Sequence, residues 1–141
     1  MRNIVNGVLV RQGSVLLARR SLHRKAYPGL WSFPGGHAEE NESLLEPLAR
    51  ELREEIGIVP TTTASVGSIG DPNSQPTDRI DNHIYAVTSW AGGEPKMIGD
   101  EHTELTWFTL RNAIARPDLA LEGYKALFKT LADAYVHTNS P

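Results

Sequence analysis

The sequence feature that most constrains this chain is a glycine pair followed by a short acidic segment, between residues 35 and 58. Ser43 and Glu46 have the spacing of a capping box, and Gly57 is a typical helix C-cap. The pattern therefore predicts a helix from about Leu44 to Ile56. Helical spacing places five apolar side chains on one arc that would pack on a core, namely Leu45, Leu48, Ala49, Leu52 and Ile56.

Three glutamates, Glu51, Glu54 and Glu55, lie on the adjoining arc of the predicted helix. Carboxylates at this spacing repel one another by about 0.2–0.5 kcal/mol per pair, and a cation above them would relieve the repulsion. Oxygen ligands without histidine or cysteine suit a hard ion such as Mg²⁺ or Mn²⁺, which can bridge to substrate phosphates. A solvated acidic face, with ion pairs from Arg50 and Arg53, is the alternative that carboxylate spacing alone leaves open.

The flanking residues favour the first interpretation. Gly36, Glu42 and the run Arg50-Glu51-Leu52-Arg53-Glu54-Glu55-Ile56-Gly57-Ile58 match the Nudix box at its fixed positions, from Gly36 to Ile58. The preceding Trp31-Ser32-Phe33-Pro34-Gly35-Gly36 resembles the approach to that box in mutator-type members. The resemblance implies an α+β fold, the Nudix α/β/α sandwich with a mixed β-sheet between helices. It also implies a divalent-metal-dependent hydrolase of nucleoside diphosphates linked to another group.

The resemblance implies roles for the box residues. Glu51 and Glu55, with the Gly36 carbonyl, would be the principal metal ligands, and Glu54 would be a shared ligand or the proton acceptor. The two successive glycines at 35 and 36 would allow a close approach of backbone to ligand and positive φ. The expected ion is Mg²⁺ or Mn²⁺.

Two further groups complete the predicted catalytic set. Arg50 would act by orientation, because Glu42 at its box position is placed to pair with it. In the family an acidic residue in a loop before an aromatic strand often reaches the metal cluster, and Glu101 is the candidate here, with Glu104 behind it. Glu101 is therefore the rival to the box glutamate as general base.

Pro47 is an unfavourable residue within the first turn of the predicted helix. At the fourth position of the predicted helix it would lose the first intrahelical hydrogen bond and crowd the Ser43 carbonyl. We expect a distorted first turn that leaves the carboxylates intact.

The remaining periodic segments predict a mixed structure. The helical patterns cover residues 110–115 and 119–136, the latter as a closing amphipathic helix. A glycine turn after Arg11 predicts a hairpin between the first two strands. The strand-like runs cover residues 3–10, 14–18, 30–33, 61–69, 80–90 and 105–108.

Candidate substrate contacts come from two regions. Arg19, Arg20 and Arg24 belong to a basic connection that precedes the box and could neutralise distal phosphates; a solvated loop is the alternative. His83 and Tyr85 share one face of a predicted strand and would line the nucleotide pocket, unless His83 is an ordinary hydrogen-bonded sheet histidine.

Length and composition set the outer limits. The 141 residues fit one domain spanning 1–141, with a frayed tail at 137–141. A net charge of −3 argues against binding of long nucleic acid, which requires a positively charged surface. The absence of cysteine excludes disulfides and thiolate sites, and no segment reads as a signal peptide or a membrane span. We expect a cytoplasmic protein with no membrane partner, and we leave its assembly, including a homodimer, open.

The leading hypothesis is hydrolysis of a (deoxy)nucleoside triphosphate to a monophosphate and pyrophosphate. The first alternative is an ADP-ribose or nucleotide-sugar hydrolase; Pro72 is an approximate match to a subfamily proline, off by one in register. The second is a catalytically silent nucleotide-binding module, which the intact Glu51, Glu54 and Glu55 disfavour. An isomerase of the same fold is disfavoured because there is no cysteine.

Overall fold

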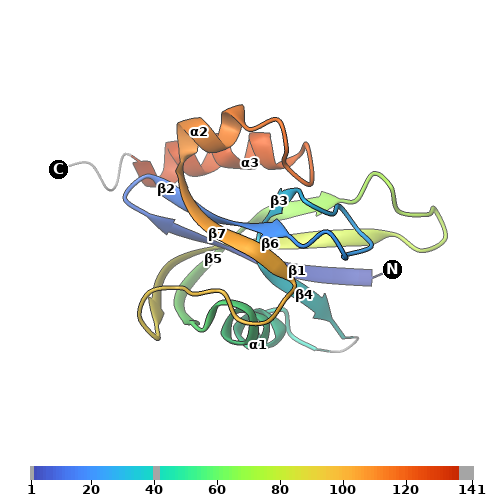
Figure 1. The fold of residues 1–141 in the computed structure, drawn as a ribbon, viewed down its shortest axis with the longest axis horizontal. Helices are drawn as coiled ribbons and strands as arrows, with labels where there is room; N and C mark the ends of the chain where they lie inside the picture. The colour runs from blue at the N-terminus through green and yellow to red at the C-terminus, as the bar shows by residue number, and fades with distance from the viewer. Residues whose placement is uncertain (1, 40–41, 137–141) are drawn as a thin grey trace.

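A computed structural model describes residues 2–39 and 42–136. Figure 1 shows three layers, with α1 (Leu45–Ile56) on one face of a mixed sheet and α2 (Leu110–Ala115) and α3 (Tyr124–Leu131) on the other. This arrangement confirms the predicted α/β/α sandwich. The predicted frayed tail, 137–141, lies outside the described residues.

The sheet is mixed because its central strand pairs in both senses. β1 runs parallel to β6 and antiparallel to β4 and β2, while β2 pairs with β3 and β7, and β5 with β6. Gln12 and Gly13 both have positive φ, 51° and 76°, as the predicted hairpin turn between β1 and β2 requires. Within the described residues the sheet has seven strands: β1 (Arg2–Arg11), β2 (Ser14–Arg20), β3 (Trp31–Ser32), β4 (Gly35–Ala38), β5 (Val59–Gly70), β6 (Ile80–Ala91) and β7 (His102–Thr109).

Two hydrophobic clusters hold the layers together, one on each side of the sheet. Because side chains alternate along a strand, Val5 and Leu9 of β1 are buried with the α1 cluster. Val8 and Val10 of the same strand are buried in the other cluster, with residues of α2 and α3 such as Phe128. β1 therefore contributes one face to each cluster, as β2 does through Leu16 and Leu17.

The apolar arc of α1 is only partly as predicted. Leu48, Leu52 and Ile56 are fully buried, but Leu45 is 51% exposed and does not pack on the core. The C-cap prediction is confirmed: Gly57 has a left-handed φ of 73° and donates its N–H to the Arg53 carbonyl at 3.2 Å.

The start of α1 differs from the prediction. The N-cap is Leu44, which has right-handed helical dihedrals and no side-chain cap, so the predicted capping box of Ser43 and Glu46 is wrong. Pro47 occupies the third helical position, where a backbone N–H would have no intrahelical partner anyway. The first bond, from Leu48 N to Leu44 O at 3.2 Å, is retained. The predicted loss of that bond at Pro47 is therefore also wrong.

The closing helix begins five residues later than predicted, at Tyr124, and its last turn widens into a π-helix, η1 (Ala132–Val136). The reason is that the preceding segment pairs with the edge of β3. Trp31 N donates to Asp118 O at 2.9 Å, and Ala120 N donates to Trp31 O at 2.8 Å. In the described part of the chain, no helix is long and apolar enough to cross a membrane.

Candidate active site

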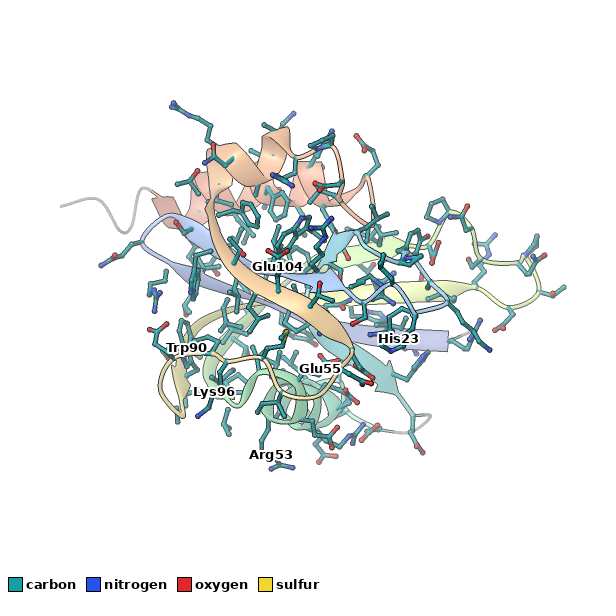
Figure 2. All side chains as sticks on the ribbon, in the orientation of Figure 1. His23, Arg53, Glu55, Trp90, Lys96 and Glu104 are labelled. Carbon is teal, nitrogen blue, oxygen red and sulfur yellow. The ribbon has the colours of Figure 1, made fainter. Side chains whose placement is uncertain are left out.

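The site is built where the C-terminal end of α1 meets β4 and the loop before β7. Glu55, 6% exposed, accepts a hydrogen bond from Gly35 N at 2.9 Å. Figure 2 shows Glu55 between α1 and the first residues of β7. A buried carboxylate in this position needs a partner, since an unpaired charge is costly to bury.

That partner is Glu101, which shares a hydrogen bond with Glu55. Burial, this hydrogen bond and the Glu101 charge raise the pKa of Glu55 to about 9. The same hydrogen bond, with Arg24 close by, lowers the pKa of Glu101. Near neutral pH, without a cation, the two carboxyl groups therefore share one proton, which resides on Glu55. The loop glutamate thus lies beside a box carboxylate, and its role as a metal ligand or general base stays a prediction.

The segment 92–101, which we call the strap, places Glu101 beside Glu55. Lys96 N donates to Ile56 O at 3.0 Å and Ile98 N donates to Glu55 O at 2.9 Å, so the strap satisfies carbonyls at the end of α1. At its far end, Ser21 N donates to Glu101 O at 3.0 Å. Figure 1 shows this loop running across α1 before it enters β7. The sequence analysis did not find the strap, because it has no periodic pattern.

Gly35 is required by close packing, because a Cβ there would lie 2.0 Å from the backbone oxygen of Val5. A Cβ at Gly36 would lie 2.4 Å from the carboxyl carbon of Glu51, at the flexible end of that side chain, so Gly36 keeps space for the Glu51 carboxylate. Neither glycine has a positive φ, so that part of the prediction is wrong. Burial, followed by the charge of Glu54, raises the pKa of Glu51.

The basic residues of α1 leave Glu51, Glu54 and Glu55 without ion pairs. Arg50 donates to Glu42 at 2.8 Å, as predicted, and Glu42 also accepts from Glu39 N at 2.9 Å. Within residues 2–39 and 42–136, no arginine or lysine lies within ion-pair distance of Glu51, Glu54 or Glu55. Of the alternative, a solvated acidic face with ion pairs from Arg50 and Arg53, the ion pairs to these three glutamates do not form.

The donor chemistry of the carboxylates fits a hard divalent cation. Glu51, Glu55 and Glu101 are electrostatic neighbours, and Glu54 neighbours Glu51. As the side chains stand, no three acidic or histidine groups of the described residues converge into a formed metal site. Glu55 nevertheless keeps a proton at a pH where an ordinary glutamate would have lost it. A cation bound to the same carboxylate oxygens would replace that proton.

A cleft of about 540 Å³ opens beside Glu55, Gly35 and Gly36. Its size is that of a small-molecule site. Arg20 and Arg24 contribute positive charge to its wall. Burial and the nearby charges of Arg24 and Arg20 lower the pKa of His102, which also lines the cleft, to about 4. At neutral pH the cationic character of the cleft therefore comes from its arginines and lysine rather than from this histidine.

Of the three predicted substrate arginines, the structure places two in the cleft. Arg20 donates to Ala26 O at 2.7 Å, and Arg24 lies 3.5 Å from the Glu101 carboxylate. Arg19 does not line the cleft and pairs instead with Glu104 at 3.3 Å. Figure 2 shows Glu104, the second candidate after Glu101, nearer the layer of α2 and α3, whereas Glu55 lies nearer α1.

His83 and Tyr85 do not line the cleft, so that prediction is wrong. They occupy the face of β6 directed to α1, where Tyr85 packs on the α1 cluster and His83 bonds to Asn3 Oδ1 at 3.0 Å. The alternate residues Ile80 and Asn82 face the cleft. The two-residue period assigned the side chains of β6 to its two faces correctly. Only the pairing of β6 with β1 shows which of these faces lines the cleft.

Sequence reasoning missed several cleft residues. Their segments meet only in the folded sheet, and the one that lies in a recognised motif, the run before the box, was given no role from the sequence. They are Asn6, Tyr27, Ser32, Asn82 and Tyr124.

Comparison with known proteins identifies the family. The family model described as the NUDIX domain matches residues 1–130. The chain belongs to the Nudix hydrolase family. Nudix hydrolases are pyrophosphohydrolases of nucleotide derivatives, and the box residue Glu55 of this chain lines the cleft at the C-terminal end of α1.

Characterised relatives of this Nudix hydrolase act on different nucleotides. It is 34% identical over 118 residues to the CTP pyrophosphohydrolase of Escherichia coli strain K12, covering 83% of this chain and 82% of the relative. It is 28% identical over 123 residues to the ADP-ribose pyrophosphatase of Methanocaldococcus jannaschii, covering 87% and 69%. The solution structure of the E. coli ORF135 protein superposes with a TM-score of 0.77 at 32% identity, covering 96% and 93%. The relatives agree on the family and differ in substrate.

Proposed function

We propose that this Nudix hydrolase converts a nucleoside triphosphate to a nucleoside monophosphate and pyrophosphate, with Mg²⁺ or Mn²⁺. The observation that carries the proposal is the buried Glu55, bonded to the exposed Glu101, at one end of a cleft whose wall contains arginines. A polyphosphate with its cation would complement both features, since the cation meets the carboxylates and the arginines meet the remaining phosphate charge.

The metal would be held by Glu51, Glu54 and Glu55 with the Gly36 carbonyl. A bound ion would screen the phosphate charge and acidify a water molecule. As a ligand, Glu55 would be deprotonated, because the positive charge of the ion would take the place of the proton beside Glu101. Glu42 holds Arg50 away from these carboxylates, which keeps their oxygens available.

The proton from the attacking water would pass to Glu54, with Glu101 as the rival acceptor. Glu54 is exposed to solvent, so its carboxylate can exchange the proton with bulk water after each turnover. Glu101 is ionised beside Glu55 and is held in place by the strap and by Arg24.

The specific rival is hydrolysis of ADP-ribose or a nucleotide sugar, favoured by the resemblance to the archaeal ADP-ribose pyrophosphatase. The two reactions differ in their products. A triphosphate gives pyrophosphate, whereas ADP-ribose gives a nucleoside monophosphate and a sugar phosphate.

The test is to incubate the full chain with each common ribo- and deoxynucleoside triphosphate, ADP-ribose and nucleotide sugars, with Mg²⁺, Mn²⁺ or a chelator. We expect pyrophosphate release from at least one triphosphate, detected by ³¹P NMR, and no product in the chelator. Release of sugar phosphate alone would transfer the proposal to the rival. A chain that binds nucleotides but cleaves none of them would contradict both.

A further inference from the structure

The floor of the cleft carries uncharged polar groups at a fixed distance from the acidic end. β4, which contains Gly35 and Gly36, lies beside β1, and β1 lies beside β6. Asn6 of β1 and Asn82 of β6 both line the cleft. Since neighbouring strands are about 4.8 Å apart, Asn82 lies about 10 Å across the sheet from β4. That separation is enough for the sugar of a nucleotide to lie between Asn82 and the acidic end of the cleft at β4.

The two asparagines form a buried pair with unused hydrogen-bonding capacity. Asn6 is 5% exposed and Asn82 is 7% exposed. Asn6 Nδ2 donates to Asn82 Oδ1 at 3.4 Å, and Asn82 Nδ2 donates to Ile69 O at 3.2 Å, which fixes both amides. Each amide group has two N–H donors and an acceptor oxygen. Asn6 therefore retains one N–H and its Oδ1, for which the described residues provide no hydrogen-bond partner.

Ser32 adds a second, independent observation. It lines the same cleft, is 3% exposed, and its hydroxyl has no hydrogen-bond partner among the described residues. Buried polar groups are almost always satisfied, so an unpaired hydroxyl beside a cleft calls for a ligand atom.

Aromatic side chains stand next to these polar groups. Phe33 and Tyr124 are buried, line the cleft and lie 4.5 Å apart between ring centroids. A flat, uncharged group with hydrogen-bonding atoms on its edge matches this combination, because its face can pack on the rings while its edge meets the amide and hydroxyl groups.

We propose that Asn6, Asn82 and Ser32 form the base-recognition site, binding the hydrogen-bonding edge of the nucleobase and setting which nucleotide the hydrolase prefers. The ligand class is a nucleobase with a donor beside an acceptor, which the amide of Asn6 can match with its free N–H and Oδ1. This inference rests on the proposed function, since it names the part of the substrate that the same cleft selects.

The test compares Ser32→Ala and Asn82→Leu with the control Asn3→Leu. Asn3 is also an amide on β1, but it bonds to His83 on the opposite face of the sheet. Steady-state kinetics on a panel of triphosphates gives KM and kcat, and calorimetry in chelator gives the affinity for each nucleoside monophosphate and for ribose 5-phosphate. Thermal unfolding checks the fold; Ser32→Ala should not lower Tm, because it removes an unpaired hydroxyl.

For Asn82→Leu we expect KM for the preferred nucleotide to rise about tenfold with kcat nearly unchanged, and the differences between bases to shrink. Ser32→Ala should shift base preference in the same way, by about threefold or more. Asn3→Leu should keep the wild-type ranking. Affinity for ribose 5-phosphate should not change in any variant.

Equal losses for every base with an unchanged ranking in both cleft variants would overturn the proposal, and so would an equal weakening of ribose 5-phosphate. Base-dependent binding of monophosphates without hydrolysis of any triphosphate would refute the proposed reaction and still support the base-recognition site.

Discussion

Replacing Glu55 by glutamine is expected to stabilise the metal-free protein at alkaline pH and to remove its activity. The wild-type fold keeps a proton on Glu55 because burial and Glu101 raise its pKa to about 9. Glutamine is neutral, has nearly the same shape and can still accept from Gly35 N. It should not replace the carboxylate as a metal ligand, so kcat should fall by at least about a hundredfold, more than is typical for residues outside the ligand set.

The direction of the pH effect follows from linkage. In the unfolded chain Glu55 loses its proton near its ordinary pKa of about 4.3, whereas in the folded chain it keeps the proton up to about pH 9. At a pH between these two pKa values, unfolding releases a proton from Glu55. The stabilisation of the fold by protonated Glu55 is therefore complete below the unfolded pKa and is lost as the pH rises through the folded pKa. In Glu55→Gln this dependence should be absent.

The measurement is thermal unfolding in chelator at pH 5.5 and pH 8.5, with Glu54→Gln as the control on the same helix. Wild type and the control should lose Tm between the two pH values, and Glu55→Gln should lose less and exceed wild type at pH 8.5. A Glu55→Gln protein that is less stable at pH 8.5, or that retains wild-type turnover, would contradict the assignment of Glu55.

Glu54→Gln is expected to lower kcat by a factor of about 10²–10⁴ without changing Tm. That range is typical for loss of a general base. Glu54 is exposed, so its replacement removes no core contact. The comparison variant is Glu101→Gln. It removes the rival general base, which is also one of the two carboxyl groups that share a proton.

Single-turnover kinetics at saturating metal and nucleotide distinguishes the two bases, because it reports the chemical step without product release. The proposal requires the larger loss in Glu54→Gln. If Glu54→Gln turns over at the wild-type rate while Glu101→Gln does not, the proton acceptor is Glu101.

The sequence predicted the layers and the acidic end of the site because those depend on local patterns. The box spacing placed Glu51 and Glu55 on one helix, and the Arg50–Glu42 pair and the Gly57 cap formed as expected. Glu101 was found from its place before an aromatic strand, and the structure brings it to Glu55.

The wrong predictions concern features that local patterns do not determine. Choosing between the two faces of β6 needed its register with β1, so His83 was placed in the cleft when Asn82 faces it. Arg19 and Arg20 are adjacent in sequence, yet only Arg20 lines the cleft. The late start of α3 is set by hydrogen bonds to Trp31, almost 90 residues earlier in the chain.

The most direct test of the central claim, that these carboxylates bind a divalent ion for phosphoanhydride cleavage, is titration with Mn²⁺ followed by electron paramagnetic resonance. We expect wild type to bind Mn²⁺ and to bind it more tightly with nucleotide present, and Glu55→Gln to bind it at least about tenfold more weakly. Equal Mn²⁺ affinity in wild type and Glu55→Gln, or no binding by the folded wild-type protein, would contradict the account.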